Sequence, residues 1–171
     1  MSITLKEGKH MINCKTDRIY LERFCNWFIK TIELEDKVEE LDKRKNVNNG
    51  KHPIRPKKGD IYMVEFGQNI GKELSNRHMA IVMQNSTSNI ASHTVNVIPI
   101  SSSKHPNPTH ITIKKEDIKT GKLNKLPSIA KVDQITCIDK ARMVYKIGSV
   151  TENFMNKLEL KIIKNLDIKA K

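Results

Sequence analysis

Apolar side chains between residues 17 and 44 recur at alternating spacings of four and three. The positions are Tyr20, Phe24, Trp27, Thr31, Leu34, Val38 and Leu41. This heptad seam predicts a long amphipathic helix over about 17–44, with Thr31 as its one weak position. Such a stripe favours packing against the helix's own domain, and it also fits a helix pair across a dimer or a lid over a basic groove. Trp27, the one tryptophan of the chain, lies on the seam and is expected to be buried.

The helical periodicity stops at a polar stretch rich in asparagine and glycine. Residues 46–53 read Asn-Val-Asn-Asn-Gly-Lys-His-Pro, and Pro56 follows. Asparagine and glycine tolerate turn geometries whereas proline interrupts helices, so this segment is predicted to be a linker. We therefore expect an N-terminal extension over residues 1–50 and a second domain over residues 51–171.

After the linker the apolar positions alternate or form short runs, which predicts strands. The predicted strands are Ile61–Phe66, Met79–Met83, Val95–Ile100, Thr109–Ile113 and Ser128–Ile135. Ser149, with Glu152 three positions on, forms a capping box that predicts a terminal helix with an apolar stripe from Phe154 to Leu166. Successive strands and a terminal helix predict an α+β fold: a small, strongly curved antiparallel β-sheet or barrel with helices packed on it.

The charge of the chain indicates its partners. The 171 residues carry a formal net charge of +12, and the pI is near 9.6. A charge this large attracts polyanions, so nucleic acid is the first expected partner and an acidic protein the second. No apolar run reaches the ~18 residues of a membrane-spanning helix, and the N-terminus lacks a signal-peptide core. Cys14, Cys25 and Cys137 form no paired motif, so reduced thiols in a cytoplasmic protein are expected.

Several kinds of active site have no signature in the sequence. The histidines show no HExxH pairing and the cysteines lack zinc-site spacing, so we expect neither a metal nor a cofactor. A P-loop, a glycine-rich nucleotide loop and a GxSxG nucleophile elbow are also missing.

Arg77, His78 and Ser101 are the side-chain types that RNA cleavage requires. Ribose supplies its own nucleophile, the 2′-hydroxyl, so the protein needs a base for that proton, an acid for the leaving 5′-oxygen and donors for the phosphorane. Arginine offers a charged fork to phosphate, histidine titrates near neutrality and serine donates a hydrogen bond. The products would carry a 2′,3′-cyclic phosphate and a 5′-hydroxyl. The alternative is that Arg77 and His78 are solvated residues of a hairpin loop.

Residues from about Lys57 to Leu166 resemble the MazF/PemK toxins of type II toxin–antitoxin systems in the order and spacing of short motifs. These motifs are Lys58-Gly59-Asp60-Ile61-Tyr62, Gly71-Lys72-Glu73, Ile81-Val82-Met83-Gln84-Asn85, Pro108-Thr109-His110, Asp133-Gln134-Ile135, Ile138-Asp139-Lys140 and Arg142. The resemblance implies a homodimeric endoribonuclease with an SH3-like, MazF/CcdB-like barrel. It also implies cleavage of single-stranded RNA at short sequences without a metal, and neutralisation by an acidic antitoxin. Residues 1–50 have no counterpart in the short family members.

The resemblance further implies a catalytic pair: an arginine after the Gly-x-Glu turn and a threonine at the end of the family's third strand. An ungapped count puts the threonine position on Ser101, which keeps the hydroxyl, and the arginine position on His78. One loop residue deleted and one added beyond it would return Arg77 to the role, so Arg77 is slightly favoured and both residues are candidates. The proline that usually follows the arginine is absent, and Thr136 stands where the family often has a late arginine. Candidate RNA contacts are Lys58, Lys72, Glu73, Asn76, Gln84, Lys104, His105, His110 and Gln134.

Two other classes of function stay open at this point. One is a binding protein on the same fold, either a degenerate ribonuclease that grips nucleic acid or a gyrase-directed toxin of the CcdB type. A gyrase-directed toxin would not need the Arg77, His78 and Ser101 set. The other is a DNA-binding regulator, for which the sequence shows no helix-turn-helix. We expect the N-terminal helix to pack on the barrel and to modulate access to the dimer groove.

Overall fold

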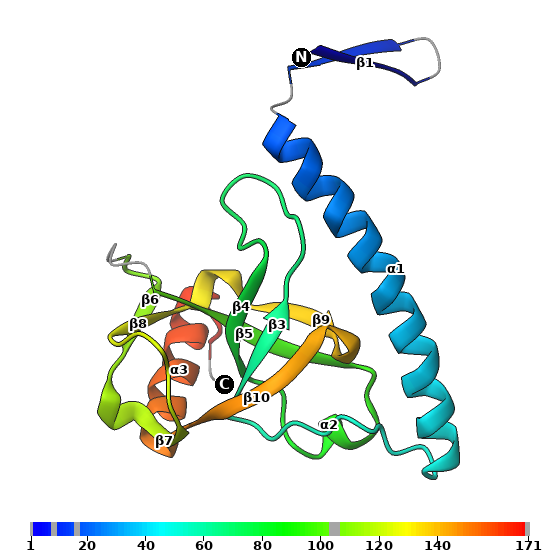
Figure 1. Cartoon of the computed structure of the whole chain (residues 1–171). Helices are drawn as coiled ribbons and strands as arrows, with labels where there is room; N and C mark the ends of the chain where they lie inside the picture. The colour runs from blue at the N-terminus through cyan, green and yellow to red at the C-terminus, as the bar shows by residue number, and fades with distance from the viewer. Residues whose placement is uncertain (1, 8–9, 16–17, 103–106, 170–171) are drawn as a thin grey trace.

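The computed structural model describes residues 2–7, 10–15, 18–102 and 107–169. Figure 1 shows a curled sheet with α3 on one face, and a long helix, α1, that carries a two-stranded hairpin beyond its N-terminus. The strands are β1 Ser2–Glu7, β2 His10–Lys15, β3 Asp60–Glu65, β4 Arg77–Val82, β5 Thr94–Ser101, β6 His110–Ile113, β7 Ile118–Gly121, β8 Ser128–Lys131, β9 Thr136–Asp139 and β10 Met143–Val150. The helices are α1 Arg18–Val47, α2 Ser88–Ala91 and α3 Glu152–Asn165, and the 3-10 turns are η1 Lys115–Asp117, η2 Val132–Gln134 and η3 Lys140–Arg142.

The main sheet is antiparallel and has the order β6-β8-β5-β4-β3-β10-β7, with β9 paired to β5. Because successive side chains of a strand point to opposite faces, the apolar residues form two cores. One core joins Ile61, Ile81 and Ile98 to Phe154 and Leu158 of α3. The second core, on the other face, is built from Val64, Phe66, Ala80, Val82, Val95, Val97, Ile138 and Met143. The predicted α+β fold with a strongly curved antiparallel sheet and two added helices is confirmed.

The end of β10 corrects the predicted start of the terminal helix. Ser149 is not a helix cap, because it lies within β10 and pairs with Asp60 and Thr120. The cap is Thr151, whose side chain accepts a hydrogen bond from the backbone N–H of Phe154. The predicted strand from Ser128 also ends early, at Lys131, where the chain enters η2.

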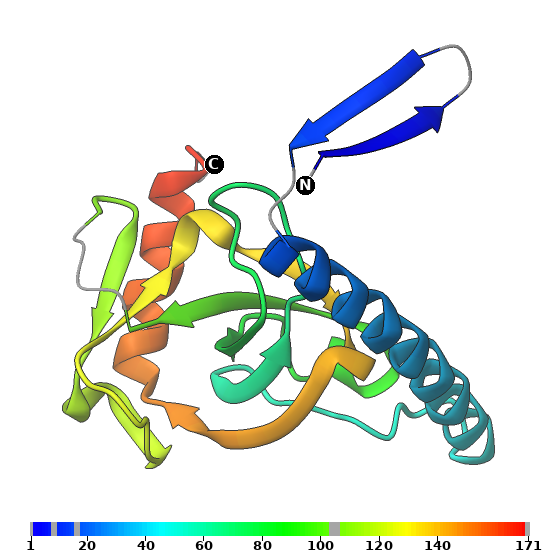
Figure 2. The ribbon, with the colours of Figure 1, turned by 45° about the horizontal axis from the view of Figure 1, so that its top comes forward.

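Helix α1 packs against the sheet through its C-terminal half. Leu41 is buried, and the Nζ of Lys37 donates hydrogen bonds to the carbonyls of Ala141 (2.7 Å) and Met143 (3.0 Å). The N-terminal half of the seam is less covered, and Phe24 keeps 53% of its surface exposed. Trp27, in this half, is half-buried against Gly67 of the β3–β4 loop, not buried as predicted. Figure 2 shows the helix running along one side of the sheet.

Within the described part of the chain, no helix has the length and apolar character that crossing a membrane requires. The boundary between an extension and a second domain near residue 50 stays a prediction. In the structure, the segment from Lys51 to Gly59 forms no helix or strand up to the start of β3.

Candidate active site

The loop between β3 and β4, residues 66–76, is held in place from outside the hairpin. The side-chain carbonyl of Gln134 in η2 accepts a hydrogen bond from the backbone N–H of Leu74 (2.9 Å). The amide nitrogen of the same side chain donates to the carbonyl of Lys72 (3.1 Å). Within the loop, the side chain of Asn69 donates to the Leu74 carbonyl (2.8 Å). These bonds fix the position of residues 72–74 relative to η2.

A pocket of about 520 Å³ lies between this loop and η2. Cationic, anionic and amide side chains surround an apolar floor, which suits a flexible polar ligand better than a compact apolar one. The lining residues are Phe66, Asn69, Lys72, Glu73, Leu74, Pro99, Asp133, Gln134, Ile135 and Thr136.

His78 and Ser101 lie next to each other beside this pocket. The register of β4 and β5 pairs Met79 with Ile100, so one further step places His78 opposite Ser101. Alternation puts Ser101 on the same face of β5 as Pro99, which lines the pocket. Burial and the charge of Lys131 lower the pKa of His78, although hydrogen bonds with the backbone raise it in part. The lowered pKa favours the neutral imidazole, which is the form that can accept a proton.

Arg77 points to the face of β4 opposite to His78. Its Nε donates to Oε1 of Glu65 at 2.7 Å, and its Nη2 bonds the same oxygen. This carboxylate, on the neighbouring strand β3, raises the pKa of Arg77. The Arg77 side chain nevertheless keeps 52% of its surface exposed. It borders a second, smaller pocket of about 270 Å³ together with Asn76 and side chains of α1.

The predicted RNA contacts fall into three groups. Lys72, Glu73 and Gln134 line the pocket, and Nε2 of His110 lies 3.2 Å from Oδ1 of the pocket residue Asp133. Asn76 lies with Arg77 in the second pocket. The structure does not bring the other described candidates to this site: Lys58 pairs with Glu159 of α3 (2.6 Å), and Gln84 contacts the Thr94 carbonyl (3.4 Å) beyond the far end of β4. Lys104 and His105 lie outside the described residues.

Other residues at the site were not among the sequence-based candidates. Glu65 positions Arg77, Lys131 lies near His78, and Thr136 lines the pocket. Thr136 was noted in the sequence only through the family resemblance. Glu65 and Lys131 have no signal in the local sequence, because strand pairing alone brings them to the site. Among the residues that the structure describes, no group of three or more His, Cys, Asp or Glu side chains is placed to hold a metal ion.

Comparison with known proteins shows the family of the chain. Residues 57–166 match the family described as PemK-like, MazF-like toxin of type II toxin-antitoxin system. The chain belongs to this family. The Endoribonuclease MazF of Staphylococcus epidermidis is similar to the toxin over 101 residues, with 31% identity across 58% of this chain and 81% of that protein.

Solved structures give the same assignment for the fold. A MazF crystal structure from Deinococcus radiodurans is 16% identical, with a TM-score of 0.58 over 67% of the toxin chain and 99% of that chain. A mycobacterial endoribonuclease in complex with its cognate antitoxin is 18% identical, with a TM-score of 0.53 over 68% of the toxin and 98% of that chain. The curled sheet with its helices is therefore the MazF fold. The family match begins at residue 57, after α1, so the helix is an addition to the matched region.

Proposed function

We propose that this MazF-like toxin is an endoribonuclease that cleaves single-stranded RNA by attack of the 2′-hydroxyl on the adjacent phosphate. The observation that carries the proposal is the strand register that sets His78 opposite Ser101, two residues along β5 from the pocket residue Pro99. The family membership and the curated MazF relative named as an endoribonuclease support it. DNA lacks the 2′-hydroxyl and would not be cut.

In the proposed mechanism, His78 begins the reaction as the general base. Its neutral imidazole takes the proton of the 2′-hydroxyl, the 2′-oxygen bonds to phosphorus, and the bond to the 5′-oxygen breaks. The imidazolium so formed can protonate the leaving 5′-oxygen. Ser101 donates a hydrogen bond to a phosphoryl oxygen, and Arg77 contributes positive charge to the bound backbone. The fragments carry a 2′,3′-cyclic phosphate and a 5′-hydroxyl, and no step requires a metal ion.

The proposal includes two protein partners, a second copy of the toxin and an acidic antitoxin, and places the toxin in the cytoplasm. One of the similar solved structures is a complex with a cognate antitoxin, and others are MazE–MazF complexes. A net charge of +12 attracts an acidic protein as well as RNA.

The test is cleavage of a long single-stranded RNA by purified toxin in EDTA. The wild type is expected to give fragments with 5′-hydroxyl ends. His78→Gln is expected to lose about 10²–10⁴-fold of the rate, the usual contribution of a general acid–base group. Ser101→Ala and Arg77→Ala are expected to cleave more slowly than the wild type. Ser149→Ala is the matched control, because that serine lies at the other end of the sheet, where its hydroxyl bonds Thr120.

Two results would contradict the proposal. Intact RNA after incubation with folded toxin that is free of antitoxin would indicate a binding protein or a gyrase-directed toxin. Unchanged cleavage by both His78→Gln and Ser101→Ala would place the active site elsewhere on the toxin.

A further inference from the structure

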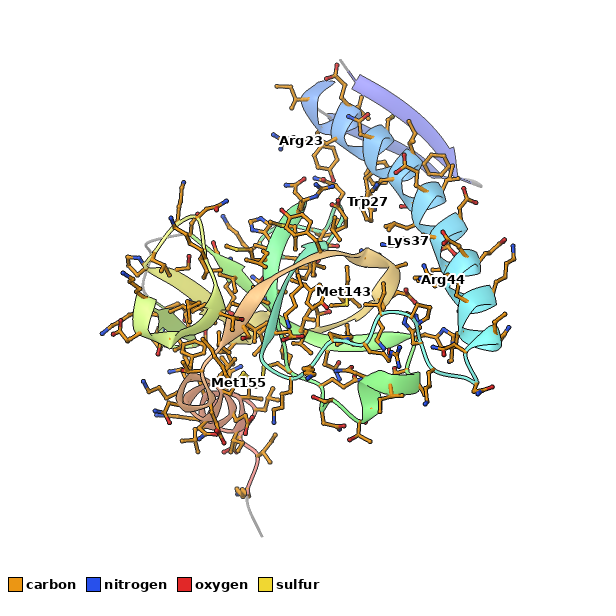
Figure 3. The ribbon with its side chains drawn as sticks, turned by 60° about the horizontal axis from the view of Figure 1, so that its bottom comes forward. Arg23, Trp27, Lys37, Arg44, Met143 and Met155 are labelled. Carbon is orange, nitrogen blue, oxygen red and sulfur yellow. The ribbon has the colours of Figure 1, made fainter. Side chains whose placement is uncertain are left out.

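The smaller pocket, of about 270 Å³, is built jointly by the MazF-like sheet and by the helix that precedes it. Helix α1 contributes Arg23, Asn26 and Trp27, and the sheet side contributes Gln68, Asn76 and Arg77. Figure 3 shows Arg23, Trp27 and Lys37 on the side of α1 that faces the sheet. The residues matched by the family begin only at position 57, so four of the nine residues that line this pocket come from outside the matched region.

Contacts of Trp27 and Lys37 hold α1 in place beside the pocket. The guanidinium of Arg142 lies 5.3 Å from the centroid of the Trp27 ring, and its Nη1 donates to the carbonyls of Glu65 (3.2 Å) and Phe66 (3.1 Å). The ring also fits against Gly67, where a Cβ atom would overlap the indole. Two further hydrogen bonds, from Lys37 to carbonyls of residues 141 and 143, fix the next turns of the helix.

Several polar side chains that line the pocket are available to a ligand, whereas Lys30 and Glu65 of its lining are paired with Glu33 and Arg77. Across the described residues, the side chains of Arg23, Asn26 and Gln68 have no hydrogen-bond or ion-pair partner. Arg77 is bonded to Glu65, yet half of its side chain is exposed. Guanidinium groups bind phosphate through paired N–H donors. Amide side chains combine a donor and an acceptor, which is what hydrogen bonding to the edge of an unpaired base requires.

We propose that α1 and the β3–β4 loop form a nucleotide subsite for single-stranded RNA. Arg23 and Arg77 bind a phosphate of the RNA, Asn26 and Gln68 read the edge of the adjoining base, and Trp27 is a positioning residue that sets the helix against the loop. The inference rests on the proposed ribonuclease function and deepens it: the N-terminal helix adds sequence preference beside the catalytic strand. A helix that merely closed the site would cover Arg77, whereas 52% of that side chain is exposed.

The pocket chemistry favours RNA over an acidic peptide as the ligand. The carboxylates of an acidic antitoxin segment accept hydrogen bonds from the arginines and from the amide N–H groups of Asn26 and Gln68, and offer none in return. The side-chain carbonyls of Asn26 and Gln68 would then depend on backbone N–H groups of the peptide. RNA bases present donors and acceptors together, so they use both halves of each amide.

The experiment compares the full-length wild type with Arg23→Ala/Asn26→Ala. Affinity is measured by fluorescence anisotropy with single-stranded 2′-O-methyl RNA oligonucleotides, which carry no free nucleophile, and cleavage sites are mapped by sequencing the ends of a long RNA. The double variant is expected to bind about tenfold more weakly, as for the loss of one arginine contact. It is also expected to relax the preference at one nucleotide near the cleaved bond. Lys43→Ala is the control, because it removes a charge from the opposite end of α1, where Lys43 is 80% exposed.

The possible outcomes separate this inference from the proposed function. If the wild type cleaves RNA and the double variant shows the same RNA affinity and the same cleavage sequence, the proposed subsite is wrong. The proposed ribonuclease function is then unaffected. If the double variant binds the antitoxin more weakly but binds RNA as the wild type does, the pocket binds an acidic peptide and the proposed RNA subsite is wrong. A wild type that neither binds nor cuts RNA would overturn both. An unchanged emission maximum of Trp27 in the double variant verifies that α1 stays in place.

Discussion

At the scale of single residues, Gln134 has the most structural consequence near the site. Its side chain forms two hydrogen bonds with the backbone of the β3–β4 loop, from a position 60 residues further along the chain. Gln134→Ala leaves the half-buried N–H of Leu74 without its partner, so we expect the free energy of unfolding to fall by about 1 kcal/mol. RNA cleavage should fall as well, because Lys72 and Glu73 are no longer held beside the pocket.

Urea unfolding of Gln134→Ala measures this effect, and Gln84→Ala is its matched control. Gln84 is half-buried, but its side-chain hydrogen bonds to Thr94 and Asn96 are exposed and both 3.4 Å long. We expect its unfolding free energy to change by less than about 0.5 kcal/mol, as for surface substitutions in general. Equal losses in the two variants would show that the loop does not depend on Gln134.

Residue types predicted the candidate chemistry, but not its geometry. The sequence favours Arg77 over His78 only slightly, and the alternation of β4 separates them by sending their side chains to opposite faces. The ungapped family count that chose His78 agrees with its place beside Ser101. Glu65 and Lys131 could not be predicted, because their proximity depends on which strands pair.

At the scale of elements, the contact between α1 and the β3–β4 loop depends on Gly67. Its φ is +90°, and any Cβ there would overlap Trp27. We expect Gly67→Ala to displace the N-terminal half of α1 and to shift the fluorescence of Trp27 to longer wavelength as the indole meets water. Backbone strain at positive φ adds about 1–2 kcal/mol of destabilisation.

A second glycine of the same loop, Gly71, distinguishes the overlap with Trp27 from the backbone strain at positive φ. Gly71 has a φ of +61° and open space where its Cβ would lie. Gly71→Ala should therefore show the backbone strain in urea unfolding without a change in Trp27 emission. If Gly67→Ala and Gly71→Ala shift the Trp27 emission equally, the conformation of the loop positions α1, and the contact of Gly67 with the indole ring does not.

Elements with a strong apolar period were predictable, and the others were not. The heptad seam gave α1 to within three residues at each end, and β3, β4 and β5 follow buried apolar runs. Strands β7 and β9 are short and largely exposed, and the middle of β10 is exposed as well. Their extended form comes from pairing with neighbouring strands, which local hydrophobicity does not encode.

At the scale of the whole molecule, the net charge of +12 predicts how RNA affinity responds to salt. Each phosphate neutralised by the toxin releases condensed counterions, so affinity falls with ionic strength. For six neutralised phosphates on a single strand, we expect about 300-fold weaker binding at 200 mM than at 50 mM salt. Anisotropy with 2′-O-methyl RNA measures this slope. Single-stranded DNA of the same sequence should show a similar slope and no cleavage, and a flat response would exclude a phosphate-dominated interface.

Helix α1 is held in place by residues that are synthesised much later than the helix itself. Lys37 bonds the carbonyls of residues 141 and 143, more than a hundred positions later in the chain. At about 5–20 residues per second, α1 leaves the ribosome roughly 5–20 s before the segment that holds it. The helix is thus made before the residues that hold it, and its place beside the sheet exists only once residues 141 and 143 have been synthesised. A newly made toxin therefore acquires the α1 side of its smaller pocket only after the strands from β3 to β9 have been synthesised.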